Sequence, residues 1–200
     1  MHATGSFDDD DDGTVFRDVI MLALLGFVTI VVLLLPHLNP PTQAVESVQP
    51  PGNVIVEVRW PDELDADVDL WVEAPGDVPV GYSNKGGRVF NLLRDDLGRS
   101  GDDTGLNYEV AYTRGIPAGA YTVNLHLYRN NAGRLPIPAV VAVSAKPAPD
   151  SPLRSIATRR VDLVRVGQEL TVVRFSLDAA GGLVPGSVHE LPRALRRAQR

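Results

Sequence analysis

The feature that most constrains this chain is an uncharged apolar run close to its N-terminus. Residues 19–35 contain no charged side chain, and Thr29 is the one strongly polar residue among them. At about 1.5 Å of rise per residue, a helix of this length just crosses a hydrocarbon core of about 30 Å. The run therefore predicts a transmembrane helix over residues 15–35. Pro36, Pro40 and Pro41 are expected to end it, because proline has no N–H for the backbone ladder.

A cleaved signal peptide is the alternative interpretation of the same run, with cleavage after Ala44. Signal peptides have a positively charged N-terminal region and a shorter apolar core. Here the apolar run is long, and residues 8–12 form an acidic block ahead of it. We therefore favour a membrane anchor, preceded by a disordered acidic tail over residues 1–14.

The orientation of the span depends on the basic residues that flank it, since Lys and Arg close to a span stay in the cytoplasm. Arg17 flanks the N-terminal side, whereas the first basic residue after the span is the distant Arg59. This asymmetry predicts a bacterial inner-membrane protein with a cytoplasmic N-terminus and a periplasmic C-terminal domain.

Beyond the span, the sequence changes first to a proline-rich spacer over residues 36–52 and then to period-two alternation. Short segments that alternate apolar and polar residues are typical of half-buried strands, and glycine, proline and aspartate separate them here. They predict an antiparallel β-sandwich over residues 53–180, followed by a basic tail over 181–200. The predicted strands are residues 53–60, 67–74, 107–113, 120–128, 139–145, 156–164 and 169–177.

Composition argues against several classes of function. The chain has no cysteine, which rules out a disulfide scaffold and cysteine-based zinc sites. Its formal net charge of −6 argues against nucleic-acid binding. The histidines have no partner at the spacing of a catalytic triad or a metal site, so His37, His126 and His189 are interpreted as separate surface residues. We expect no enzymatic activity.

Closely spaced aspartates suggest a cation site in the β domain. Asp65, Asp67 and Asp69 lie two residues apart, so a strand would direct them to one side. Asp102 and Asp103 belong to a later acidic loop. Because Ca²⁺ prefers oxygen ligands, these five residues predict a calcium site, and no other cofactor is expected. The alternative is a solvated acidic rim that keeps a strand edge from pairing with other molecules.

Part of the β region resembles a known family. The segments "DVDLWVEAPGDVPVGYSNKGG" and "NYEVAYTRGIPAGAYTVNLHLY" are similar to the YfaP-type domain of unknown function (DUF2135-like), over residues 53–128. The shared features are an Asp-x-Asp-Leu strand, a proline-glycine turn, a glycine-rich loop and a Pro-x-Gly-x-Tyr-Thr-Val strand. The resemblance implies a β-sandwich in the cell envelope without established enzymatic activity.

The segment "FRDVIMLALLGFVTIVV", residues 16–32, resembles the start of the transmembrane helix in the ExbD/TolR family. The resemblance lies in the Phe-x-Asp-Val start and the methionine and leucines that follow. Members of this family are subunits of proton-driven motors. The resemblance implies that Asp18 accepts and releases the translocated proton. It also implies a homodimer inside an ExbB/TolQ/MotA-like integral membrane ring protein.

Asp18 also has a purely structural interpretation. A carboxylate at a helix N-terminus caps free N–H groups and stabilises the helix by about 0.3–1 kcal/mol. A carboxylate deeper in lipid costs about 2.5–3.5 kcal/mol and is retained there mainly for a proton or ion path. With 3.6 residues per turn, Leu22, Leu25 and Thr29 share the face of Asp18 and are its predicted pore-facing neighbours.

These observations lead to two functional hypotheses. The first is a motor subunit that is driven by proton flow and whose periplasmic β domain engages an envelope partner. The second is a membrane-tethered envelope binding module without proton transport. In the second hypothesis Asp18 only caps the helix, and the β domain binds a protein, a glycan or calcium.

Overall fold

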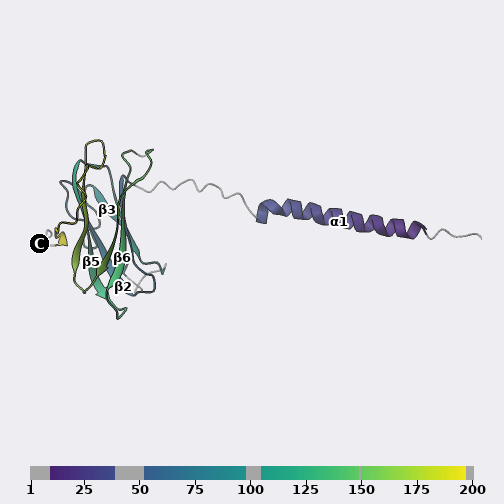
Figure 1. Cartoon of the computed structure of the whole chain (residues 1–200), viewed down its shortest axis with the longest axis horizontal. Coiled ribbons are helices and arrows are strands. Elements are labelled where there is room, and N and C mark those ends of the chain that lie inside the picture. Colours follow the sequence, from purple (N-terminus) through teal and green to yellow (C-terminus); the bar gives the residue numbers. More distant parts are fainter. Residues whose placement is uncertain (1–9, 39–51, 98–104, 149, 197–200) are drawn as a thin grey trace, which may run out of the picture. The chain divides into compact units, whose positions relative to one another are not determined.

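The computed structural model describes residues 10–38, 52–97, 105–148 and 150–196. The chain divides into two compact units, Met1–Gln49 and Pro50–Arg200. The described part of the first unit is a single helix, α1 (Asp10–Leu38), and the second unit is a β domain (Figure 1).

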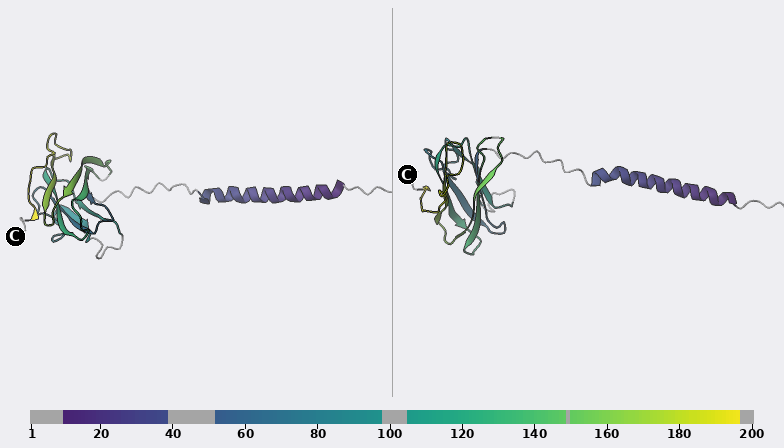
Figure 2. Two further views of the ribbon diagram at one scale, coloured as in Figure 1. Left: turned by 60° about the horizontal axis from the view of Figure 1, so that its bottom comes forward. Right: turned by 45° about the horizontal axis from the view of Figure 1, so that its top comes forward.

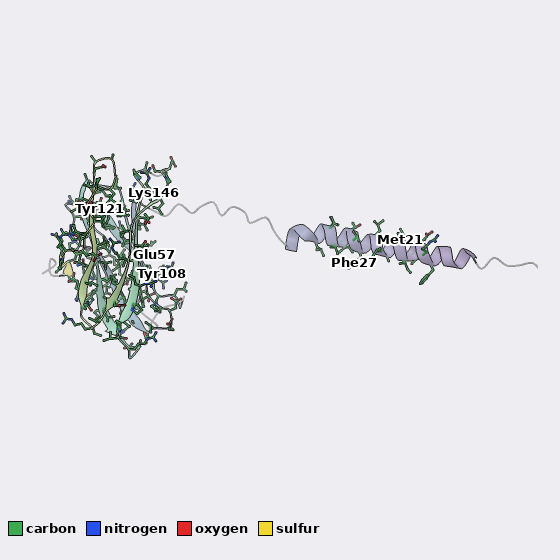
Figure 3. The ribbon with its side chains drawn as sticks, in the orientation of Figure 1. Met21, Phe27, Glu57, Tyr108, Tyr121 and Lys146 are labelled. Carbon is green, nitrogen blue, oxygen red and sulfur yellow. The ribbon has the colours of Figure 1, made fainter. Side chains whose placement is uncertain are left out.

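Helix α1 contains the predicted span. Its segment Val15–Leu34 has a mean hydropathy of 2.3 and is long enough to cross a membrane. Large apolar side chains are exposed along it, and Met21 and Phe27 project outward from the helix axis (Figure 3). A helix that is apolar on all sides is stabilised by lipid or by other helices rather than by water. Its length, composition and position suit a membrane anchor or a signal sequence.

The helix extends beyond the predicted span at both ends. It begins at Asp10, and its backbone stays helical past Pro36 as far as Leu38. Pro36 therefore does not end the helix by itself, and the helix ends at Leu38, two residues before Pro40 in the sequence. Pro36 lies in the last turn, where the missing N–H removes one backbone hydrogen bond but the turn still closes.

The described part of the β domain contains eight strands in two antiparallel sheets. The five-stranded sheet has the order β3-β4-β1-β6-β7, and the three-stranded sheet has the order β2-β5-β8. The sheets pack against each other as a sandwich (Figure 1, Figure 2), which confirms the predicted mainly β fold behind one N-terminal helix. The strands are β1 (Val54–Arg59), β2 (Ala66–Glu73), β3 (Phe90–Arg94), β4 (Tyr108–Thr113), β5 (Gly119–Asn130), β6 (Ile137–Ala145), β7 (Arg154–Leu163) and β8 (Glu169–Leu177).

The hydrophobic core lies between the two sheets. In β1, every second residue is buried, beginning with Val54, while the residues between them are half-buried or exposed. Tyr121 of β5 stacks on Phe175 of β8 with 5.1 Å between ring centroids, and its hydroxyl donates to the carbonyl of Pro117 at 2.7 Å. Burial of apolar surface at roughly 25 cal/mol per Å² is the main stabilising contribution of this core.

Strand β2 differs from β1 because it is buried on both faces. One face, which includes Leu70, lies against the core. On the other face, Trp71 is 1% exposed and packs edge-on against Tyr82, with 5.6 Å between ring centroids. A Cβ at Gly81 would come within 2.5 Å of the Trp71 ring, so only glycine fits there. The segment that contains Gly81 and Tyr82 therefore covers the outer face of β2, and the polar residues of that face lie inside the protein.

Candidate functional site

The first candidate site is Asp18 in α1. The helix begins at Asp10, so Asp18 lies beyond the first turn, where the backbone N–H groups are already bonded within the helix. The capping interpretation of Asp18 therefore does not fit this helix. On the same face, the Thr29 hydroxyl donates to the carbonyl of Leu25 at 2.8 Å. Since Thr29 is satisfied within the helix, Asp18 is the group on this face that needs a partner or water.

The second candidate site is a group of acidic side chains beside the covered face of β2. Asp69 of β2, Asp95 after β3 and Glu109 of β4 each place one carboxylate oxygen within 4.8 Å of the other two. The Asp96 N–H donates to Glu109, and Asp67 interacts electrostatically with Asp69. These five residues are called the acidic cluster below.

Glu109 joins the two sheets at the edge of the sandwich. It is fully buried, and its Oε2 and Oε1 accept the backbone N–H groups of Leu70 at 2.7 Å and Asp96 at 3.1 Å. Strand β2 is an edge strand, so its outward N–H groups need acceptors from outside their own sheet. Burial raises the pKa of Glu109 well above its ordinary value, and the two backbone N–H groups oppose this shift. Glu109 therefore closes the edge of the sandwich.

Asp69 forms a buried pair with His126 of the neighbouring strand β5. The two residues are directly paired in the sheet, and Asp69 Oδ2 lies 2.6 Å from His126 Nδ1. Burial raises the pKa of Asp69, whereas the hydrogen bond and the charge of His126 oppose this rise. The expectation that His126 is a lone surface residue is therefore wrong: it is 2% exposed and has a carboxylate partner.

Basic side chains balance the remaining members of the acidic cluster. Three of the acids form ion pairs, and in each pair the acidic side chain is largely buried. The cluster is therefore a network of ion pairs rather than a row of solvated acids. The pairs are Lys85 with Asp95 at 2.9 Å, Arg94 with Asp96 at 3.2 Å and Arg129 with Asp67 at 3.6 Å.

The structure brings together two of the five residues predicted for calcium. Asp67 and Asp69 are each 3% exposed, so the alternative of a solvated acidic rim is wrong for them. Asp65 precedes β2 and contacts Asn131, whose backbone N–H donates to the Asp65 carbonyl at 2.8 Å. Asp102 and Asp103 lie outside the described residues.

The acidic cluster offers the oxygen ligands that Ca²⁺ prefers, but it offers fewer of them than Ca²⁺ requires. Ca²⁺ takes about six to eight oxygen ligands. Among the described residues, Asp67 Oδ1 and Asp95 Oδ1 are buried carboxylate oxygens without a hydrogen-bond partner, whereas both oxygens of Glu109 accept backbone N–H groups. Two such oxygens do not make a complete calcium site, and calcium binding here stays a prediction.

The buried acids make the stability of the β domain depend on pH. Burial and the nearby Asp69 carboxylate raise the pKa of Asp67 to about 7, although Arg129 opposes the rise. An unfolded aspartate titrates near 4, so between about pH 4 and pH 7 the folded state holds a proton that the unfolded state has lost. The free energy of unfolding should therefore fall as pH rises through this window. We expect a loss of roughly 2–3 kcal/mol between about pH 5 and pH 8 from Asp67, in the same direction as the effects of Asp69 and Glu109.

The measurement is urea unfolding of the full chain at several pH values. Trp60 and Trp71 are both buried in the β domain, so their fluorescence reports its unfolding. Asp67→Asn should flatten the pH dependence, and Asp162→Asn, at an exposed position of β7, should leave it unchanged. A wild-type stability that stays constant or rises between these pH values would contradict the prediction.

Comparisons with protein-family models, with curated proteins and with solved structures find no match to this chain. The two family resemblances drawn from the sequence therefore stay predictions. The position of Asp18 in α1 and the geometry of the β domain are the features that bear on function.

Proposed function

We propose that this chain is a single-pass inner-membrane subunit of a proton-driven motor of the ExbB/ExbD or TolQ/TolR kind. Asp18 carries the proton, and the β domain lies in the periplasm and engages an envelope partner. The observation that carries this proposal is the position of Asp18, inside α1 rather than at its end and within the apolar segment Val15–Leu34.

The energetics of insertion support a role for Asp18. A charged carboxylate at the centre of a bilayer costs about 2.5–3.5 kcal/mol on insertion scales, and Asp18, the fourth residue of Val15–Leu34, bears part of this cost. A helix that serves only as an anchor gains nothing from such a group, whereas a proton carrier requires a titratable group within the membrane. Both Asp18 and the apolar surface of α1 are accommodated when the helix, as a homodimer, lies inside a ring of partner helices.

The second candidate function is a membrane-tethered envelope binding module without proton transport. It is favoured by the β domain, which has its own hydrophobic core and a polar cavity and needs no contribution from α1 to form either. In this alternative, the charge at Asp18 is tolerated near the membrane surface, and binding by the β domain is the whole activity.

Purification of the complex from the host membrane separates the two functions. The full chain, tagged and extracted in mild detergent, should co-purify with a multi-helix integral membrane protein and should be present as two copies. Asp18→Asn should co-purify equally, because the substitution removes the titration and little of the surface. A chain that is recovered without a membrane partner would favour the tethered module.

Protease added to spheroplasts should degrade the β domain, and protection of that domain would contradict the proposed orientation.

A further inference from the structure

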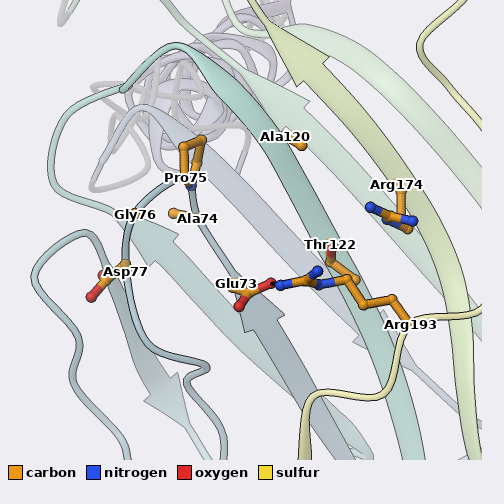
Figure 4. Close-up of a pocket in the computed structure, with 9 residues that line it drawn as sticks. All are labelled: Glu73, Ala74, Pro75, Gly76, Asp77, Ala120, Thr122, Arg174 and Arg193. Carbon is orange, nitrogen blue, oxygen red and sulfur yellow. Dashed lines mark hydrogen bonds and ion pairs between the residues drawn. The ribbon is translucent and has the colours of Figure 1, made fainter. Parts of the chain in front are cut away.

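A polar cavity opens on the outer face of the three-stranded sheet. Its volume is about 360 Å³, within the range of roughly 300–1,000 Å³ that is usual for ligand sites. Its base is a row across all three strands, in which Glu73 of β2 pairs with Thr122 of β5 and Thr122 pairs with Arg174 of β8. The turn after β2 forms one side, and Arg174 and Arg193 lie on the other (Figure 4).

The wall that contains Arg193 is fixed in place. The guanidinium of Arg193 contacts the Glu73 carboxylate through Nη2 at 2.7 Å and Nε at 2.8 Å. The Arg193 carbonyl accepts the side-chain amide of Asn124 at 2.7 Å, and Leu195, two residues further on, is fully buried. The C-terminal segment is therefore held against the sheet. The carboxylate of Glu73 is already paired with Arg193.

The other carboxylate of the cavity, Asp77, is also engaged. It accepts the backbone N–H groups of Val78 at 2.8 Å, Arg88 at 3.1 Å and Val89 at 2.6 Å. These hydrogen bonds outweigh partial burial and hold the pKa of Asp77 below its ordinary value. Asp77 is thus a rigid, charged part of the wall whose oxygens are occupied by the loop itself.

Arg174 is the charged group of the cavity that has no counter-ion. Among the described residues, no carboxylate forms an ion pair with its guanidinium, and its Nε is buried without a hydrogen-bond partner. A partly desolvated guanidinium without a partner is unfavourable, because arginine stays charged and cannot neutralise itself by losing a proton. An anion in the cavity would remove this imbalance.

We propose that this cavity binds the carboxylate group of a ligand, with Arg174 as its main charged contact. The planar guanidinium matches a carboxylate in shape as well as charge, and Thr122, which pairs with Arg174 in the sheet, also lines the cavity. Glu73 and Asp77 disfavour a dianion in the same space, so a monoanionic carboxylate fits better than a phosphate. The cavity leaves room for the atoms next to the carboxylate, as at the end of a short peptide or in a small organic acid.

The test is ligand binding to the full chain in detergent, followed by the unfolding midpoint from tryptophan fluorescence. N-acetylglycine should bind with a Kd of about 1–10 mM and raise the midpoint, whereas its neutral amide and inorganic phosphate at equal ionic strength should not. N-acetyl-Ala-Ala with a free C-terminus is the peptide probe. Tighter binding than that of N-acetylglycine assigns the site to a peptide terminus, and equal binding assigns it to small acids.

Two variants make the test specific to the cavity. Arg174→Gln should weaken N-acetylglycine binding at least about tenfold, and its midpoint without ligand should be unchanged or higher, because an unpaired charge is removed. Arg160→Gln, which removes the same charge at an exposed position of β7, should bind like wild type. Equal binding by the amide, tighter binding of phosphate, or full binding by a folded Arg174→Gln would overturn the inference.

The carboxylate site does not depend on proton transport. Asp18→Asn should bind N-acetylglycine as tightly as wild type, since Asp18 belongs to the other unit of the chain. If Arg174→Gln does not fold, Arg174→Lys provides the second comparison. It keeps the charge but loses the planar fork, and we expect binding to weaken several-fold. If Arg174→Lys binds N-acetylglycine as tightly as wild type does, and also binds the neutral amide, the inference would likewise be overturned.

Discussion

Glu109→Ala should lower the free energy of unfolding of the β domain by about 3–5 kcal/mol. The substitution leaves the N–H groups of Leu70 and Asp96 buried without their acceptor, and each unsatisfied group costs roughly 1–3 kcal/mol. It also opens a cavity at a fully buried position between the sheets. Removal of a carboxyl group that is costly to bury offsets part of this loss, and for that reason the expected value stays below the full sum.

The measurement is urea unfolding of the full chain, followed by tryptophan fluorescence. Glu109→Gln keeps the volume and one acceptor, so its loss should be smaller than that of Glu109→Ala. The control is Glu63→Ala, since Glu63 is highly exposed and its pair with Arg134 at 3.4 Å is worth at most about 1 kcal/mol. A loss below about 1 kcal/mol in Glu109→Ala would show that Glu109 does not close the sandwich edge.

The parts of the fold that follow from local patterns could be predicted from the sequence. The apolar run gives the membrane-length helix, and the regular alternation in β1 gives a strand with one buried face. Both signals come from neighbouring residues and need no knowledge of what packs against them. The short strand β3 (Phe90–Arg94) was missed, because five residues next to a glycine-rich loop carry little periodic signal.

The acidic cluster was only partly predictable, because its burial depends on distant segments. In β4, alternation alone favours Tyr108, Val110 and Tyr112 for the core, yet the fully buried residues are Glu109, Ala111 and Thr113. Glu109 can be buried because the edge of β2 supplies a donor for it, and the sequence of β4 contains no sign of that edge. Patterns of polarity within one strand cannot reveal a partner in the other sheet.

The pairing of Asp69 with His126 could not be predicted for a related reason. The two residues are 57 positions apart and meet only because β2 and β5 pair in one register. A bulge between Asp67 and Val68 shifts that register by one residue. Since a one-residue slip changes the pairing of every side chain, the sequence indicates the strands but not which residues face each other.

Asp18→Asn should abolish proton conduction, which is the largest functional effect that we expect. The substitution keeps the size and most of the polarity of the side chain but removes its ability to gain and lose a proton. Asp18→Glu should retain part of the activity, because it keeps a titratable carboxyl group on the same face of α1. Thr29→Val should retain most of it, since the Thr29 hydroxyl is already bonded to the carbonyl of Leu25.

The most direct measurement is proton uptake by liposomes that contain the complex purified through this chain. A potassium diffusion potential drives protons inward, and a trapped pH dye reports their arrival. Wild type should acidify the interior, Asp18→Glu should do so more slowly, and Asp18→Asn should match empty liposomes although it recovers the same membrane partner. Proton uptake by Asp18→Asn at the wild-type rate would contradict the assignment of Asp18 as the proton carrier.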